Sequence, residues 1–240
     1  MQRYFLNERD FTENIIHGSD VFHIIKVMRM NVNDQIEVCY DGNAYLAKIN
    51  NLNENEVGFT IINKIESIQN KCEITLIQGI AKGDKNEQII KHSTELGVDN
   101  IIFCAMTRSI AVFDDKKIAS KLERFNKIAK EAAEQSHRNT IPKISYISNI
   151  KMLENYDFEL KLLLDEEEAK KDNPLLIKNV DINKNNIAFL VGPEGGIAEK
   201  ERQFCLLNQF LPISLGKNIL RTETASLAFL AMLKYSLMEK

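Results

Sequence analysis

The chain has 240 residues, of which 44% are hydrophobic and 8% aromatic. That apolar content is ample for a packed core, so a disordered chain is excluded and one large or two modest domains are expected. The formal net charge of −3 at pH 7 gives no overall attraction for nucleic acid, so a surface that binds nucleic acid would have to be local.

The N-terminal residues and the cysteines indicate the cellular compartment in which the protein is expected. Residues 1–10 mix charged and aromatic side chains and lack the apolar stretch of a signal peptide, and no apolar run approaches the ~20 residues of a membrane span. We therefore expect a cytoplasmic protein with no membrane partner. The four cysteines contain no C-x-x-C pair, which predicts buried free thiols without a disulfide or a bound metal.

Residues 1–70 have the pattern of a small β-rich domain. A helix is expected over residues 20–30, where apolar side chains recur at helical spacing. Alternating residues predict a strand over 36–40, a hairpin turn at Asp41-Gly42, a return strand over 45–49 and a further strand over 57–65. Short strands joined by Asn-rich turns favour a small β-barrel, with a junction near residues 65–70.

From Cys72 onward, strands and helices alternate. Strands are predicted at residues 74–77, 101–103, 144–146 and 161–164, with helices over 84–96 and 116–136. The fold class is therefore α/β, with a largely parallel sheet over residues 71–240.

Two glycine-bearing loops lie near the C-terminus. Gly192-Pro193-Glu194-Gly195-Gly196 stands between an apolar strand at 187–191 and a helix at 198–203, and residues 216–225 stand between a strand at 213–215 and the last helix. Taken alone, the first loop is equally compatible with an ordinary tight turn. Together, two strand-to-helix loops at the carboxyl edge of a parallel sheet predict a pocket for a small, nucleoside-like ligand.

This residue chemistry does not name a reaction. Neither loop has the spacing of a dinucleotide-binding or phosphate-binding loop. The chain has four histidines and no Gly-x-Ser-x-Gly segment, so a nucleophilic triad is not supported.

Six segments in sequence order resemble a known family. They are residues 23–29 (HIIKVMR), 82–85 (KGDK), 94–98 (TELGV), 108–109 (RS), 131–138 (EAAEQSHR, with Pro142 following), and the two C-terminal loops 191–196 (VGPEGG) and 215–225 (LGKNILRTETA). The two loops resemble those of the SPOUT methyltransferases, and the remaining segments narrow the resemblance to the ribosomal small subunit methyltransferase E family over nearly the whole chain.

The resemblance implies a fold and an activity. It implies a PUA-like RNA-binding β-barrel over residues 1–70 and a SPOUT domain with a deep trefoil knot over 71–240. It also implies a homodimer that binds S-adenosylmethionine (SAM) in the knotted loops. Members of the family methylate N3 of one uridine in 16S ribosomal RNA, so 16S rRNA or the 30S subunit is the expected partner.

The resemblance also assigns site residues. The expected cofactor-binding residues are Leu190, Gly192, Pro193, Glu194, Gly195, Gly196, Leu215, Gly216, Asn218, Ile219, Leu220, Thr224 and Ala225. The expected RNA-binding residues are Arg3, Lys26, Arg29, Lys82, Lys85, Arg108, Arg124 and Arg138.

Methyl transfer to a uridine nitrogen requires alignment of the reacting atoms and loss of the N3 proton. Arg138 and Arg221 are the expected catalytic cations, because either would stabilise a uracil anion, and Glu194 is expected to orient the cofactor or the RNA. The group that removes the proton is left open, with His137 as one candidate. Two alternatives also remain open: a SPOUT methyltransferase acting on tRNA, and a non-catalytic RNA-binding assembly factor.

Overall fold

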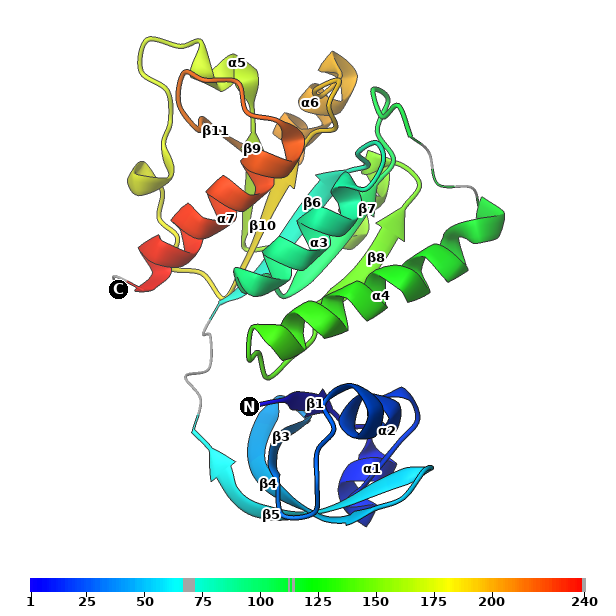
Figure 1. The fold of residues 1–240 in the computed structure, drawn as a ribbon. Helices are drawn as coiled ribbons and strands as arrows, with labels where there is room; N and C mark the ends of the chain where they lie inside the picture. The colour runs from blue at the N-terminus through cyan, green and yellow to red at the C-terminus, as the bar shows by residue number, and fades with distance from the viewer. Residues whose placement is uncertain (67–71, 112, 114, 239–240) are drawn as a thin grey trace. The chain divides into compact units, whose positions relative to one another are not determined.

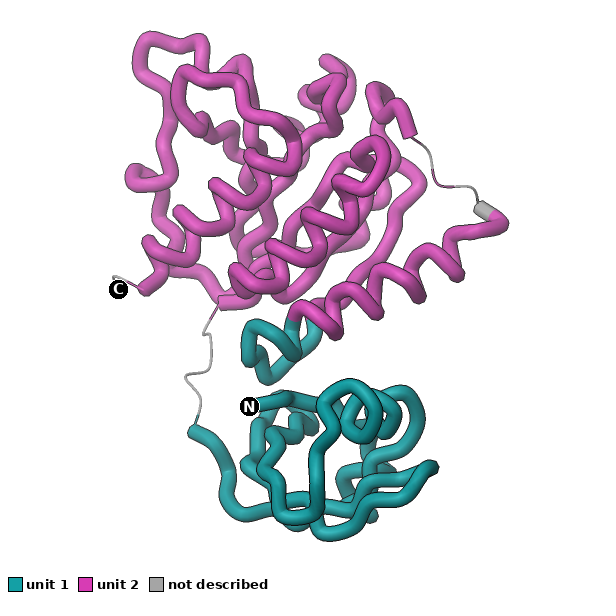
Figure 2. The backbone as a smooth tube through the Cα atoms, in the orientation of Figure 1, with its two compact units in different colours: residues 1–69, 133–141 teal, residues 70–132, 142–240 magenta. Residues whose placement is uncertain are grey.

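The computed structural model describes residues 1–66, 72–111, 113 and 115–238, and their packing divides the chain into two units (Figure 2). The first unit is Met1–Gln69 together with Ala133–Ile141, and the second is Asn70–Ala132 together with Pro142–Lys240. The predicted boundary at residues 70 and 71 falls at a stretch outside the described residues. Residues 133–141 were expected in the second domain, whereas their packing joins them to the first unit.

The first unit is built on a curled five-stranded sheet in the order β1-β3-β4-β5-β2 (Figure 1). Its elements are β1 (Arg3–Phe5), α1 (Glu8–Glu13), β2 (Ile15–His17), α2 (Ser19–Phe22), the π-helix η1 (His23–Val27), β3 (Gln35–Tyr40), β4 (Asn43–Leu52) and β5 (Glu56–Ile65). The predicted hairpin is confirmed, because Asp41 and Gly42 both have positive φ, 46° and 71°, as a two-residue type I′ turn requires. Two register shifts between β4 and β5 accompany the bend of the sheet.

The segment 133–141 is fastened to the first unit by Arg3, which is only 5% exposed. The guanidinium of Arg3 donates to Glu37 Oε2 at 2.8 Å, to the His137 carbonyl at 2.5 Å and to Asn139 Oδ1 at 2.7 Å. His137 Nδ1 lies 3.0 Å from the same Glu37 oxygen. Burial opposes ionisation of Glu37, but hydrogen bonds from His137 and Arg3 outweigh it and hold the pKa of this carboxyl below its usual value.

The second unit contains a six-stranded sheet in the order β11-β9-β10-β6-β7-β8, and every neighbouring pair is parallel. Its strands are β6 (Glu73–Gly79), β7 (Asn100–Cys104), β8 (Lys143–Ile147), β9 (Leu160–Leu164), β10 (Asn186–Val191) and β11 (Leu211–Ile213). Its α-helices are α3 (Lys85–Glu95), α4 (Ile118–Gln135, whose last turn packs with the first unit), α5 (Glu166–Ala169), α6 (Glu199–Leu207) and α7 (Thr222–Met238), with short 3-10 helices η2 (Asp115–Lys117), η3 (Ile150–Asn155) and η4 (Ile177–Asn179). The predicted α/β class with a parallel sheet is confirmed.

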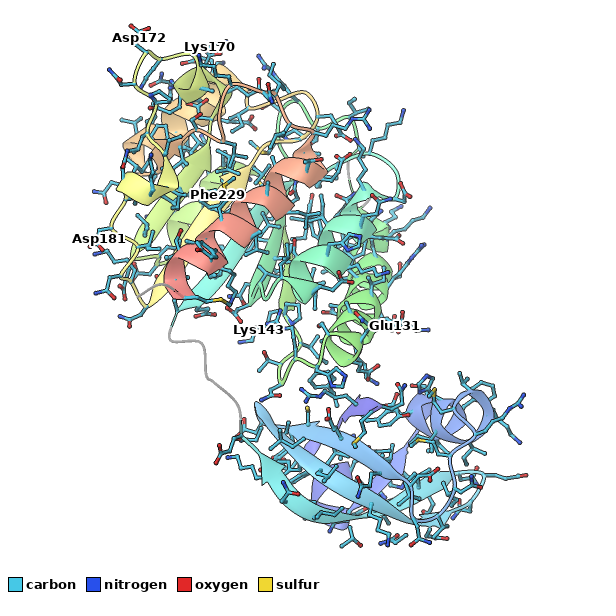
Figure 3. The ribbon with its side chains drawn as sticks, turned by 60° about the vertical axis from the view of Figure 1, so that its left-hand side comes forward. Glu131, Lys143, Lys170, Asp172, Asp181 and Phe229 are labelled. Carbon is cyan, nitrogen blue, oxygen red and sulfur yellow. The ribbon has the colours of Figure 1, made fainter. Side chains whose placement is uncertain are left out.

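Helices cover both faces of this sheet. On one face α3 and α7 lie side by side (Figure 1), and Phe229 of α7 packs on Phe189 of β10 with ring centroids 5.0 Å apart (Figure 3). Phe125 of α4 packs on Phe103 of β7 in the same way, at 5.1 Å. On the other face, Cys205 of α6 is buried among apolar residues of β6, β7, β9 and β10. Within the described residues, no helix is long and apolar enough to cross a membrane.

Candidate active site at the carboxyl edge of the parallel sheet

The loops that follow β6, β9, β10 and β11 meet at one edge of the sheet, because these four strands are adjacent and parallel. The chain places β7 and β8 on one side of β6, and β10, β9 and β11 on the other. Open parallel sheets bind ligands at such a reversal of strand order. The expectation that the two glycine-bearing loops face the same sheet edge is confirmed.

A buried chain of hydrogen bonds ties the first glycine-bearing loop to α7. Thr222 Oγ1 donates to the Gly192 carbonyl at 2.6 Å and accepts from Gln78 Nε2 at 2.8 Å. Ser226 Oγ donates to Gln78 Oε1 at 2.5 Å. Gln78 and Ser226 are 0% exposed and Thr222 is 5% exposed. Since buried polar groups are costly when unpaired, this network fixes the loop, the end of β6 and the start of α7 in one arrangement.

An ion-pair cluster holds the other side of the same loop. Glu194 Oε1 accepts from the Lys82 backbone amide and from Lys85 Nζ, both at 3.0 Å, and Lys85 Nζ also lies 3.3 Å from Glu223 Oε2. Burial opposes ionisation of Glu194, but the hydrogen bonds from Lys82 and Lys85 outweigh it and keep its pKa below the usual value. Glu194 therefore links the loops after β6 and β10 as a carboxylate.

At two positions in the loops, packing or backbone conformation within the protein requires glycine. A Cβ on Gly195 would lie 2.8 Å from the Arg108 carbonyl oxygen and 2.9 Å from Arg108 Cβ, so only glycine fits there. Arg108 Nη1 in turn donates to the Gly195 carbonyl at 3.3 Å. Gly216 has φ +110°, a backbone conformation that side chains rarely adopt. The glycines thus serve the packing of the loops as well as any approach by a ligand.

A third loop, residues 165–175 after β9, completes this edge. Asp165 pairs with Arg202 of α6 at 2.8 Å, and both side chains are largely buried. The Leu175 amide donates to Glu168 Oε1, and the Leu175 carbonyl accepts from the Ser214 amide, both at 2.9 Å. The loops after β9 and β11 are therefore joined through their main chains.

The second glycine-bearing loop is open to solvent. Lys217, Asn218 and Ile219 are exposed, and the apolar side chain of Ile219 is 79% exposed. Arg221, at the start of α7, is also exposed and makes no ion pair within the part of the chain that the structure describes. A cation and an apolar side chain are thus available to a ligand or substrate at this point.

The other expected cofactor-binding residues differ in exposure. Leu190 is 0% exposed, and its side chain belongs to the core beneath the sheet, so it forms no part of the loop surface. Pro193 and Ala225 are buried, Gly196, Leu215 and Leu220 are half-buried, and Thr224 is exposed.

The expected RNA-binding residues are divided between the units. Lys82 and Arg108 are exposed on the second unit at the carboxyl edge, whereas Arg124 is paired with Glu87 at 2.8 Å. Lys26 and Arg29 are exposed on the first unit, which also contains the half-buried Arg138.

Arg3 requires a correction. It was expected to contact RNA, but its guanidinium is buried and bound to Glu37 and the 137–139 loop, which leaves no surface for a phosphate. Its structural task is to anchor the loop that carries Arg138.

Sequence reasoning did not single out Gln78, Ser226, Asp165 or Arg202. Two signals were present in the chain. Gln78 follows the largely apolar run Ile74–Ile77, and Ser226 interrupts an apolar helix, so each was a polar residue where burial was expected.

Comparison with known proteins gives the family. Residues 68–234 match the RNA methyltransferase domain family, and residues 16–62 match the RNA methyltransferase PUA domain. Ribosomal RNA small subunit methyltransferase E of Bacillus subtilis is 35% identical over 98% of this chain and 96% of its own length. The chain belongs to this methyltransferase family.

Other members of the family also match this chain over nearly its full length. The enzyme of the same name from Rickettsia conorii is 31% identical over 97% of this chain and 94% of its own length. A crystal structure of the Neisseria gonorrhoeae family member, bound to S-adenosyl methionine, superposes with a TM-score of 0.86 at 30% identity, and covers 98% of both chains. As a family member the chain is an RNA methyltransferase, and its first unit contains the family's PUA domain.

Proposed function

We propose that this protein transfers a methyl group from SAM to N3 of a uridine in 16S ribosomal RNA. The observation that carries the proposal is the convergence of the loops after β9, β10 and β11 on one sheet edge, in a chain of which 98% matches a SAM-bound relative. The name shared by the relatives supports small-subunit ribosomal RNA as the substrate.

The loops fit a nucleoside cofactor. Main-chain amides and carbonyls of residues 192–196 and 214–220 bind the adenosine part, and their positions are fixed by Thr222, Glu194 and the Leu175–Ser214 bond. SAM supplies an electrophilic methyl group when bound. Glu194 acts by positioning the loops, since its carboxylate is already engaged by Lys82 and Lys85.

Loss of the N3 proton leaves negative charge on the uracil ring. An arginine near the ring lowers the energy of this charge and thereby lowers the barrier to methyl transfer. Arg221 is proposed for this role because it is exposed at the mouth of the site and makes no ion pair among the described residues. Arg138 is proposed as the second cation, held in place by the Arg3–Glu37 anchor of its loop.

The proposed partners are the ribosomal RNA of the small subunit and a second copy of the chain. Lys26, Arg29, Lys82 and Arg108 present exposed cations to RNA. A homodimer is supported by the outer face of α7, where Met232, Tyr235 and Met238 recur at helical spacing with 45%, 63% and 80% exposure.

The decisive experiment is mass spectrometry of ribosomal and transfer RNA from a strain lacking the gene, with and without complementation. Loss of 3-methyluridine from 16S rRNA alone is expected. Loss of a tRNA modification instead would replace the proposed substrate, and failure of calorimetry to detect SAM binding would favour a non-catalytic assembly factor. Methylation of protein-free 16S rRNA and of purified 30S subunits, measured in parallel, identifies the substrate form.

A further inference from the structure

The first unit exposes a group of large apolar side chains around α2 and η1. Phe22 is 64% exposed, Val27 56%, Met28 37% and Val32 45%. Single exposed apolar residues are ordinary on protein surfaces, whereas several within one short stretch of chain mark a binding surface. We call these four residues, with Lys26 and Arg29, the α2 surface.

Backbone geometry produces this exposure. After Phe22 the helix widens to a π-helix, in which the Met28 amide donates to the His23 carbonyl at 2.8 Å. Ile24 is fully buried, while the four consecutive residues 26–29 are all exposed. Arg29 then takes a left-handed conformation with φ 53°, which costs a residue other than glycine about 1–2 kcal/mol. Wide turns of this kind and such backbone strain recur at functional sites.

A contact between His23 and β1 fixes the backbone of the α2 surface. Tyr4 of β1 is 1% exposed, and its hydroxyl lies 3.1 Å from Nδ1 of His23. The two rings also meet edge to face, with centroids 5.8 Å apart. Because His23 is fixed against β1, its neighbour Phe22 has a fixed backbone from which its ring projects into solvent.

The charges favour a polyanion as the occupant. Lys26 and Arg29 are exposed and make no ion pair among residues 1–66, 72–111, 113 and 115–238. The nearby carboxylate of Asp34 is engaged by the Asn31 amide at 2.7 Å. An exposed aromatic ring beside unpaired cations is the chemistry that proteins use for unpaired nucleotides, in which the ring stacks on a base and the cations contact phosphates.

We propose that the α2 surface binds an unpaired nucleotide of the RNA substrate, with Phe22 stacked on a base and with Lys26 and Arg29 on the adjoining phosphates. The inference rests on the proposed RNA methyltransferase function and adds a stacking residue to it. It also explains how an acidic chain selects RNA, because base stacking does not depend on net charge.

The test measures binding of the full-length protein to a single-stranded RNA oligonucleotide and to a duplex of the same sequence. Phe22→Ala should weaken single-strand binding by roughly 5- to 150-fold, the loss expected for one base stack, and weaken duplex binding much less. Phe22→Tyr should bind within about threefold of wild type, because it keeps the ring. Ile62→Ala removes another exposed side chain of the first unit, 49% exposed, and is the matched control.

Two further measurements separate the proposal from its alternatives. Lys26→Ala and Arg29→Ala should each reduce the slope of log affinity against log salt by about one. Equal binding by Phe22→Ala and Ile62→Ala overturns the proposal. The proposal is also overturned if Phe22→Ala binds assembled subunits more weakly but binds protein-free RNA normally. In that case the α2 surface binds a ribosomal protein. Absence of methyl transfer by the wild-type protein refutes the proposed function instead, whatever the oligonucleotide shows.

Discussion

Replacing Thr222 with valine should both destabilise the second unit and weaken cofactor binding. The substitution keeps the shape of the side chain but removes the hydroxyl that donates to the Gly192 carbonyl and accepts from Gln78. Each buried group left unpaired costs about 1–3 kcal/mol, so the Gly192 carbonyl and one N–H of Gln78 together should lower the free energy of unfolding by about 2–6 kcal/mol. For a protein of this size that corresponds to a fall in Tm of roughly 4–24 °C.

The assay combines differential scanning calorimetry with titration of SAM. Thr222→Ser retains the hydroxyl and should restore most of the stability and affinity. Thr12→Val is the control, because the Thr12 hydroxyl is exposed on α1 and bonds only to the Glu8 carbonyl at 2.8 Å. If Thr222→Val melts within about 2 °C of Thr12→Val, the buried network does not fix the loop and the reasoning is refuted.

Gly195→Ala places a Cβ 2.8 Å from the Arg108 carbonyl oxygen, and calorimetry should show at least a tenfold loss of SAM affinity. Gly18→Ala strains the backbone of the first unit, where φ is +76°, but its Cβ meets nothing within 4 Å; as a control for general destabilisation it should leave SAM affinity unchanged. The pKa of Glu194 is lower in the folded protein than its ordinary value of 4.5. The stability that this carboxylate contributes is therefore present above pH 4.5 and is lost as the pH falls through the folded pKa. The difference in Tm between wild type and Glu194→Gln should vanish at acidic pH. Arg138→Ala should abolish methylation of 16S rRNA while SAM affinity stays within a few-fold, and unchanged activity would remove Arg138 from the mechanism. Arg3→Lys should fail to restore the stability lost in Arg3→Ala, since a lysine cannot hold Glu37 and the 137–139 loop together; equal melting of Arg3→Lys and wild type would contradict this.

The sequence predicted the parts of the fold that follow from local pattern. Apolar runs gave the strands near residues 74–77, 101–103 and 161–164, and the turn at Asp41-Gly42 was specified by its residue types. The three-residue strands β1 and β2 were missed, because each depends on a distant partner rather than on its own pattern.

The site was predictable in outline only. The glycine-bearing loops and the shared sheet edge followed from spacing, but the partners of their side chains did not. Gln78 and Thr222 are 144 residues apart in the chain, and Arg3 meets Asn139 across 136 residues. Nothing in local sequence distinguishes a cation that faces RNA from one that anchors a loop. Arg3 was therefore assigned to the surface on its charge alone, and the trefoil knot stays a prediction from the resemblance.

The fastening of residues 133–141 to the first unit has a consequence for synthesis. Arg3 emerges first from the ribosome, yet the His137 carbonyl that it binds is 134 residues away. At ~5–20 residues per second, about 7–27 s pass between the synthesis of Arg3 and that of His137. Until then the Arg3–Glu37 ion pair, at the β1 edge of the N-terminal sheet, lacks two hydrogen-bond acceptors, the His137 carbonyl and Asn139 Oδ1. Completion of the RNA-binding unit is therefore timed by translation of the catalytic one.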